Sequence, residues 1–442
     1  MKFFLKSGIF LSFIILIYII YRSEIFWDGS KRTFYFIYFV GALLAIFFLI
    51  ICTYLNVKIQ KYVIIIFIST VFTFYSFEGY LTYKIYKIKT NLNLDPRSMF
   101  EVFDDLKKIN LNTAIVIPPR SFLNFDKLNF YSLGGISKAK TVFCNEAGYY
   151  SIYQSDRYGF NNPDKEWDSK EIEYLLVGDS FTHGACVNRP HDVASVLRKY
   201  SKKNVLNLGQ SGNGPLIEYA TLREYLAPNV KNVLWLYFEG NDLVDLENEL
   251  KNNILNKYLV NQKFNQDLKL RQNQIDKFLT NFIRERRETE RQRDRETERQ
   301  RDRETERQRD RETEIHNAGI IRFIKLINIR TTLHTRLPPS PSPPPELKII
   351  LKLANELVES YNQKLYFIYL PSFERYAKML KIDFKQEIKN TVIDLGIEFI
   401  DIDEEVFKKK NNPLKLFPLE RGPHYNIEGY KEVALKIYEK IK

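Results

Sequence analysis

Residues 174–184 read Tyr-Leu-Leu-Val-Gly-Asp-Ser-Phe-Thr-His-Gly. The apolar run at the start predicts a buried strand, and the Gly-Asp-Ser that follows places Ser180 where this strand ends. Open α/β sheets hold their ligands at the carboxyl ends of their strands. A serine there becomes a nucleophile only if a base takes its proton and hydrogen-bond donors hold the oxyanion. The alternative to a catalytic role is that Asp179 and Ser180 only cap a helix. A base and oxyanion donors elsewhere in the chain would favour the catalytic role.

The run at 174–177 is one of several β-rich runs that alternate with stretches of helical spacing. The β-rich runs are 173–177, 204–208, 232–238, 364–370 and 397–402, and the helical stretches between them are 191–200, 216–226 and 347–362. Strands that are apolar almost throughout are typical of parallel sheets buried on both faces. We therefore predict an α/β fold in which helices cover both faces of a parallel sheet.

Two of the β-rich runs end in turns that can supply oxyanion donors. Residues 204–214 end in Gly-Gln-Ser-Gly-Asn-Gly, and a glycine such as Gly212 lets a backbone N–H approach a ligand closely. Residues 235–242 end in Gly-Asn-Asp, where the side-chain amide of Asn241 is a neutral donor. A base is offered by His424, which is one of five histidines and lies in a short polar loop after the last strand.

With Ser, Gly, Asn and His following strands in this order, the chain resembles the SGNH (GDSL-like) hydrolase family, which is named for these four residues. The resemblance places the nucleophile on Ser180 and its base on His424. It places the oxyanion hole on the backbone N–H groups of Ser180 and Gly212 and on the side chain of Asn241. It implies a flavodoxin-like three-layer sandwich with a parallel sheet, and neither a cofactor nor a metal ion.

The resemblance covers about residues 172–242 and 347–440. In addition, Ser-Asp-Arg-Tyr-Gly-Phe-Asn-Asn-Pro-Asp at 155–164 and Tyr-Phe-Glu-Gly-Asn-Asp at 237–242 resemble a subgroup of membrane-linked bacterial SGNH proteins associated with surface polysaccharides. This implies a serine esterase that removes O-acyl groups from a cell-envelope or exported polysaccharide through an acyl-enzyme on Ser180. The alternatives are an O-acyltransferase acting on the same glycans and a catalytically inert glycan-binding relative.

Two positions depart from the family pattern. Glu239 stands where the third block usually opens with glycine, and Arg421 stands three residues before His424, where the orienting acid usually lies. The group that orients His424 is therefore left open. It is either one of three carboxylates or a backbone carbonyl, in which case Ser180 and His424 would work as a dyad. The three carboxylates are Glu420, Asp401 and Asp403. His183 is a competing base, which we interpret instead as a loop or rim residue.

Long uncharged runs are concentrated in the first 90 residues. They lie at 7–21, 34–54 and 62–83, the last interrupted by Glu78, and 34–54 is long enough to cross a bilayer core of roughly 30 Å. No small-x-small cleavage site follows the first run, which favours an uncleaved anchor over a signal peptide. We expect residues 1–90 to form a membrane anchor of about three transmembrane helices in the bacterial inner membrane. The catalytic domain is expected on the extracytoplasmic side, although the distribution of Lys and Arg does not fix the orientation.

The soluble part is expected to comprise a lead-in at 91–170, which packs on an SGNH domain at 171–442. The lead-in includes a Gly-, Asn- and Tyr-rich segment at 144–167, which reads as ordered loop. The SGNH domain is interrupted by a charged insert at 284–314, built on repeats of Arg-Glu-Thr-Glu-Arg-Gln-Arg-Asp, and by a Pro-rich linker at 338–345. Neither segment can build a core, so we interpret both as surface insertions.

The net charge of +12 does not indicate a nucleic-acid-binding protein, because the lysines are scattered and no zinc-finger or RNA-binding motif is present. An anionic membrane surface or an acidic glycan accounts for the same charge. Of the three cysteines, Cys52 lies in an apolar run and is interpreted as a packing residue. Cys144 and Cys186 form either a disulfide or two free thiols. If they pair, they would fasten the lead-in over the site.

Overall fold

The computed structural model describes residues 2–26, 29, 32–91, 95–125, 129–304, 323–326, 329, 342–377, 379–380 and 382–442. The chain divides into two compact units. Unit 1 comprises residues 1–88 and 308–335, and unit 2 comprises residues 89–307 and 336–442. The first half of the expected Pro-rich linker, 338–341, and the end of the charged insert, 305–314, lie outside the described residues.

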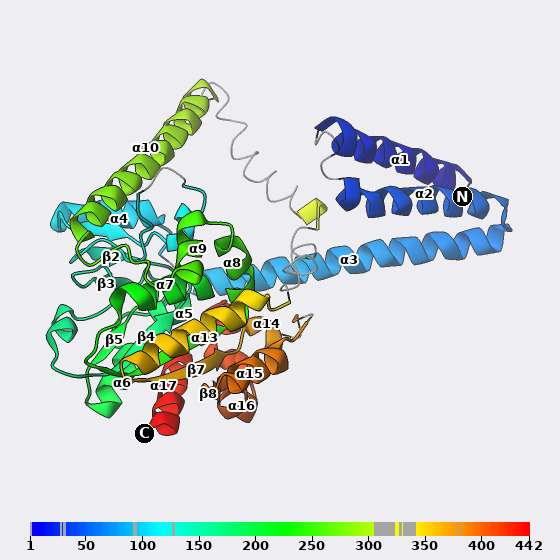
Figure 1. Ribbon diagram of the computed structural model, residues 1–442. Coiled ribbons are helices and arrows are strands. Elements are labelled where there is room, and N and C mark those ends of the chain that lie inside the picture. Colours follow the sequence, from blue (N-terminus) through cyan, green and yellow to red (C-terminus); the bar gives the residue numbers. More distant parts are fainter. Residues whose placement is uncertain are drawn as a thin grey trace. The chain divides into compact units, whose positions relative to one another are not determined.

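Unit 1 is helical. Its elements are α1 (Lys2–Ile20), a π-helix (Tyr21–Phe26), α2 (Arg32–Tyr54) and α3 (Val57–Asn91), the last of which continues into unit 2. Helices α1 and α2 lie side by side (Figure 1). Two segments have the length and apolar composition of a membrane span, Lys2–Ile25 and Val57–Tyr83. The described apolar part of α2, Tyr38–Tyr54, is shorter, so two of the three expected spans meet these criteria and the third stays a prediction.

Unit 2 is built on a five-stranded parallel sheet. Its strands are β4 (Ile172–Gly178), β5 (Val205–Asn207), β6 (Val230–Phe238), β7 (Lys364–Leu370) and β8 (Glu398–Asp401). Each of the five β-rich runs of the sequence therefore forms a strand, and the predicted parallel α/β sheet is confirmed. The spatial order is β5-β4-β6-β7-β8, which is the 2-1-3-4-5 order of flavodoxin-like doubly wound sheets.

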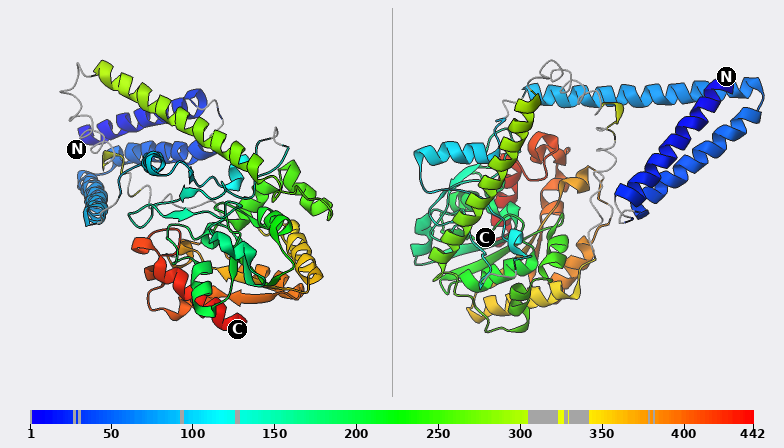
Figure 2. Two further views of the ribbon diagram at one scale, coloured as in Figure 1. Left: turned by 90° about the vertical axis from the view of Figure 1, so that its left-hand side faces the viewer. Right: turned by 90° about the horizontal axis from the view of Figure 1, so that it is seen from above.

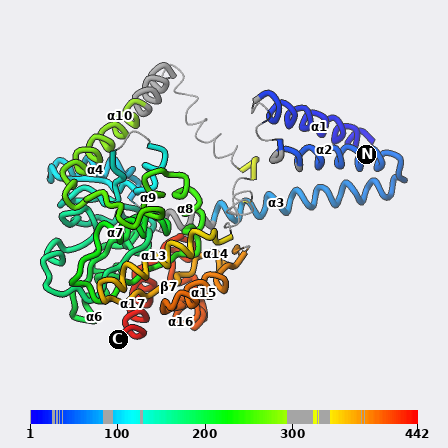
Figure 3. The backbone as a smooth tube through the Cα atoms, viewed as in Figure 1, coloured from blue at the N-terminus to red at the C-terminus, as the bar shows by residue number. Residues whose placement is uncertain are grey.

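Alternate side chains of each strand enter two separate cores, because successive side chains of a strand point to opposite faces. In β4, Leu175 and Val177 face the layer formed by α7 (Pro215–Tyr225), α13 (Pro345–Ser360) and α15 (Lys385–Asp394). Leu176 faces the layer formed by α6 (Val193–Ser201) and α17 (Ile427–Ile441). Helices thus cover both faces of the sheet, and the backbone can be followed through these layers in Figure 3.

The lead-in forms a second, smaller sheet in the order β1-β2-β3, made of β1 (Thr113–Ile115), β2 (Lys140–Val142) and β3 (Ile152–Gln154). It also contributes α4 (Met99–Ile109) and two 3-10 helices, η2 (Pro119–Phe122) and η3 (Asp164–Asp168). Its apolar side chains, among them Phe122 and Val142, belong to the same core as Val177 of the main sheet. The segment at 144–167 contains β3, which pairs with β2, and most of η3, so it is not loop throughout.

The remaining elements of unit 2 are short, except for α10. They are α5 (Ser180–His183), α8 (Asp242–Glu249), α9 (Asn253–Val260), α10 (Gln272–Glu304), α14 (Phe373–Tyr376), α16 (Ile402–Glu405) and three 3-10 turns, η5 (Phe407–Lys409), η6 (Pro413–Leu416) and η7 (Pro418–Glu420). The charged insert begins inside α10, beside α4 (Figures 1 and 2), where Arg287 forms an ion pair with Asp104. The start of the insert is therefore in contact with the surface of unit 2.

Candidate active site

Three of the residues singled out by the sequence lie at the carboxyl ends of neighbouring strands. Ser180 follows β4, Gly212 lies in the turn after β5, and Asn241 follows β6. In the order β5-β4-β6-β7, the connection after β4 runs to β5 and the connection after β6 runs the opposite way to β7. The carboxyl ends of β4 and β6 therefore form the switch point at which doubly wound sheets place their sites.

The turn from β4 into α5 requires glycine and presents Ser180. A Cβ on Gly178 would lie 2.1 Å from Thr182 Oγ1 and 2.7 Å from the Leu236 carbonyl oxygen, so no larger residue fits. Asp179 caps α5 by accepting a hydrogen bond of 2.9 Å from the Phe181 N–H. The capping explanation is thus correct for Asp179, and it leaves the Ser180 side chain available for another partner.

Ser180 and His424 are hydrogen-bonded to each other. The Oγ of Ser180 lies 2.9 Å from Nε2 of His424, and Nδ1 of His424 lies 2.7 Å from Oε1 of Glu146. A carboxylate only accepts hydrogen bonds, so Nδ1 carries the proton and Nε2 is left to accept from the serine hydroxyl. Asp179 Oδ2 is a longer alternative acceptor for that hydroxyl, at 3.3 Å. The imidazole also packs on Phe181, with ring centroids 5.0 Å apart.

The carboxylate that contacts His424 is that of Glu146, and the structure places none of the three carboxylates expected for this position against the imidazole. Asp401 caps α16 and forms an ion pair with Lys385, and Asp403 is buried among Lys385, Tyr376 and Arg375. Glu420 lies exposed in η7. Both ring nitrogens of His424 already have partners in Ser180 and Glu146. The imidazole is therefore held by a carboxylate rather than by a backbone carbonyl.

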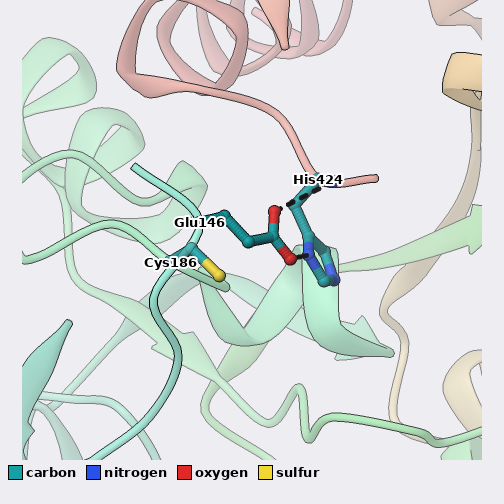
Figure 4. A group of neighbouring side chains, drawn as sticks. All are labelled: Glu146, Cys186 and His424. Atoms are coloured by element: carbon teal, nitrogen blue, oxygen red, sulfur yellow. Dashed lines mark hydrogen bonds and ion pairs between the residues drawn. The ribbon is translucent and has the colours of Figure 1, made fainter. Parts of the chain in front are cut away.

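A disulfide between Cys144 and Cys186 holds Glu146 near Ser180. The two Cα atoms are 5.0 Å apart, and Cys186 follows Ser180 by six residues while Glu146 follows Cys144 by two. Figure 4 shows the Glu146 carboxylate turned toward the imidazole of His424, with the Cys186 sulfur beside it. Potential metal-ligand atoms of Glu146, Cys186 and His424 lie within 4.8 Å of one another, but this sulfur is already bonded to Cys144. The sequence allowed either a disulfide or two free thiols at Cys144 and Cys186, and the structure contains the disulfide.

The residues expected to form the oxyanion hole have backbone and side-chain N–H groups at this edge. Gly212 has φ +72°, and among the residues that the structure describes none accepts a hydrogen bond from its backbone N–H. Asn241 donates one amide hydrogen to Asp245, which leaves the second for another acceptor. Asp245 is almost fully buried, and this burial raises the pKa of its carboxyl.

His183 is neither the base nor a rim residue, because it is fully buried. Its Nε2 lies 2.8 Å from the Tyr153 hydroxyl, its Nδ1 accepts a hydrogen bond of 3.2 Å from the Ser211 N–H, and its ring stacks on Phe143. Burial lowers the pKa of His183 to about 3, so the imidazole is neutral. The side chain supports the Ser211–Gly212 turn instead of contacting Ser180.

The two departures from the family pattern have structural explanations. The carboxylate of Glu239 accepts hydrogen bonds from the Tyr369 hydroxyl, the Ser372 N–H and the Arg375 guanidinium, which fastens the end of β6 to the segment after β7. Arg421 is exposed, and its place in the sequence does not leave His424 without an acid, because Glu146 takes that role from the lead-in.

Glu146 could not be found from the family spacing, because it lies 278 residues before His424 in the sequence. The available signal was a carboxylate two residues after Cys144, whose partner cysteine lies six residues after Ser180. Had the disulfide been assumed, this spacing would have brought Glu146 to the site.

No family model matches the chain, and no curated protein matches it. Among solved structures, the chain is similar to one described as a lipolytic protein of the G-D-S-L family from Desulfitobacterium hafniense DCB-2. The two are 14% identical with a TM-score of 0.31, and the match covers 61% of this chain and 99% of that chain. At this level of identity and superposition, the likeness does not assign an activity to the chain.

Proposed function

We propose that the protein is a serine esterase of SGNH type. The observation that carries this proposal is the chain of hydrogen bonds from Ser180 Oγ to His424 Nε2, and from His424 Nδ1 to Glu146 Oε1. A nucleophile, a base within hydrogen-bond reach and a third group that orients the base are the requirements for acyl transfer through a serine.

In the proposed reaction, His424 takes the proton of Ser180 as the oxygen attacks the ester carbonyl. The N–H groups of Ser180 and Gly212 and the free amide hydrogen of Asn241 stabilise the oxyanion. His424 then gives its proton to the leaving alcohol, and the acyl group remains on Ser180. Water, activated by the same histidine, attacks the acyl-enzyme, which releases the acid and restores the serine. Glu146 keeps the imidazole in the required tautomer and stabilises its charged form.

The natural substrate in this proposal is an O-acylated polysaccharide of the cell envelope or an exported glycan. The Cys144–Cys186 disulfide supports a location of unit 2 outside the cytoplasm, because disulfides persist in oxidising compartments. The apolar helices of unit 1 support anchoring in the bacterial inner membrane. An acyltransferase would use the same residues, with a sugar hydroxyl in place of water. A catalytically inert relative would be favoured if His424 lacked an orienting carboxylate, and the contact with Glu146 argues against that alternative.

The test uses the full-length protein in detergent with p-nitrophenyl acetate, beside Ser180→Ala and His424→Ala. We expect hydrolysis by the unmodified protein, loss of at least 100-fold in both variants, an order-of-magnitude figure for a missing triad member, and covalent labelling of Ser180 by a fluorophosphonate. A folded protein that neither hydrolyses the ester nor reacts with the fluorophosphonate would refute the esterase and leave glycan binding as the function of this fold.

A further inference from the structure

Arg120 of the lead-in lies over Gly212, one residue proposed for the oxyanion hole, and close to Asp245, which accepts a hydrogen bond from another, Asn241. A Cβ on Gly212 would be 2.6 Å from Cδ and Nε of Arg120, so the arginine side chain runs directly over this glycine. Its Nη1 lies 3.6 Å from Oδ1 of Asp245, which is the carboxylate that binds Asn241. The guanidinium therefore borders the place where the ester would react.

The backbone that carries Arg120 is held on both sides. The Tyr131 hydroxyl donates a hydrogen bond of 2.8 Å to the Pro119 carbonyl, and the Asn252 amide donates one of 2.9 Å to the Leu123 carbonyl. Phe122 is buried within an aromatic cluster that includes Phe278, 5.0 Å away between ring centroids. The position of the arginine is thus set by the fold and not by a mobile loop.

The guanidinium of Arg120 has N–H donors available for a ligand. The Arg120 side chain is 52% exposed, whereas that of Asp245 is 10% exposed. Its contact with Asp245 is longer than a hydrogen bond, and a guanidinium carries five N–H donors in a planar fork. An exposed fork of this kind binds carboxylates and phosphates through paired hydrogen bonds.

We propose that Arg120 binds an anionic substituent, a carboxylate or a phosphate, on the sugar that carries the ester. This inference rests on the proposed function and specifies its substrate class as an acylated acidic glycan. The arginine determines specificity for that glycan, since it lies beside the acyl-transfer groups but is not needed to move the proton. The basic net charge of +12 fits an anionic substrate of the same kind.

The test compares three O-acetylated methyl glycosides that differ only at C6: a glucuronoside, a glucoside 6-phosphate and a neutral glucoside. For the unmodified full-length protein we expect kcat/KM for one of the two anionic esters to exceed that for the neutral ester about tenfold or more, the usual strength of a charge-assisted hydrogen bond. The better anion identifies the substituent. In Arg120→Gln this ratio should fall toward one, and Arg120→Lys should keep part of it.

Arg291→Gln is the matched control, because Arg291 on α10 is 53% exposed and, within the part of the chain that the structure describes, forms an ion pair with one carboxylate, that of Asp104, at 3.3 Å. This variant should keep the ratio of the unmodified protein. A ratio near one in the unmodified protein would overturn the proposal. So would an equal loss on charged and neutral esters in Arg120→Gln, which would mean that the arginine only neutralises Asp245.

Failure of the esterase itself is distinguished by binding. Titration calorimetry of Ser180→Ala with the three glycosides needs no turnover, and it should show tighter binding of the same anionic glycoside, lost when Arg120→Gln is added. If this binding is present but p-nitrophenyl acetate is not hydrolysed by the unmodified protein, the proposed function fails and the anion site stands. If binding does not depend on Arg120, the anion site is refuted.

Discussion

Replacement of Glu146 by glutamine tests the acid that only the structure revealed. Glutamine keeps the size of the side chain and an oxygen that can accept from Nδ1 of His424, but it removes the negative charge. As His424 takes the serine proton, its ring becomes positive, so the charge of Glu146 matters more in the transition state than in the resting enzyme. The loss should therefore appear mainly in kcat.

The expected decrease in kcat can be estimated from the ion pair between His424 and Glu146. Opposite charges about 4 Å apart attract by about 4 kcal/mol at the effective dielectric constant typical near a protein surface. The side chains of His424 and Glu146 are 19% and 20% exposed, so solvent screens part of this attraction. A loss of transition-state stabilisation of about 2 to 4 kcal/mol corresponds to a decrease in kcat of about 30-fold to 1000-fold.

The assay is p-nitrophenyl acetate hydrolysis by the full-length protein, with fluorophosphonate labelling of Ser180 as a second measure of nucleophile reactivity. Glu420→Gln makes the same chemical change at an exposed carboxylate close to His424 in the sequence, and it should leave kcat unchanged. Thermal unfolding checks that both variants are folded. A folded Glu146→Gln with kcat within threefold of the unmodified protein, or an equal loss in Glu420→Gln, would refute the assignment.

Two further predictions concern groups around the site. The oxidised, denatured chain should contain one reactive thiol, that of Cys52. Replacing Cys144 and Cys186 by alanine should lower both kcat and the free energy of unfolding. The lost cross-link spans 42 residues, and the chain entropy of such a loop corresponds to about 4 kcal/mol of stability. A count of three thiols, or full activity in the double variant, would contradict this. For His183, the ordinary pKa of 6.5 falls to about 3 in the fold, so below pH 6.5 the unfolded chain binds a proton that the native protein does not. The free energy of unfolding should then fall by about 3 kcal/mol from pH 6.5 to pH 4. Urea unfolding followed by proteolysis measures this decline. An equally steep decline in a His183→Gln variant would count against His183 as its cause.

Much of the sheet could be predicted from the sequence, because buried parallel strands have a local signature. Each of the five strands contains a short apolar run. The turn after β4 needs a glycine and a helix cap, which are visible in the sequence as Gly178 and Asp179. The same local logic placed Ser180, Gly212 and Asn241 after neighbouring strands. Their common location follows from strand direction, since the carboxyl ends of parallel strands meet at one edge.

The partners of the candidate site residues depend on contacts between segments far apart in the chain, which no local pattern specifies. Glu146 reaches His424 across 278 residues because the Cys144–Cys186 disulfide and the second sheet hold the lead-in at this edge. His183, three residues after the nucleophile, looked available as a base, yet tertiary packing buries it against Phe143 and Tyr153. The sequence by itself determined the strands and pointed to Ser180 and His424, which the structure brings into hydrogen-bond contact. Tertiary structure alone decided which carboxylate lies against His424 and which arginine lies beside Gly212, because hydrogen bonds and burial depend on distance in space and not on position in the chain.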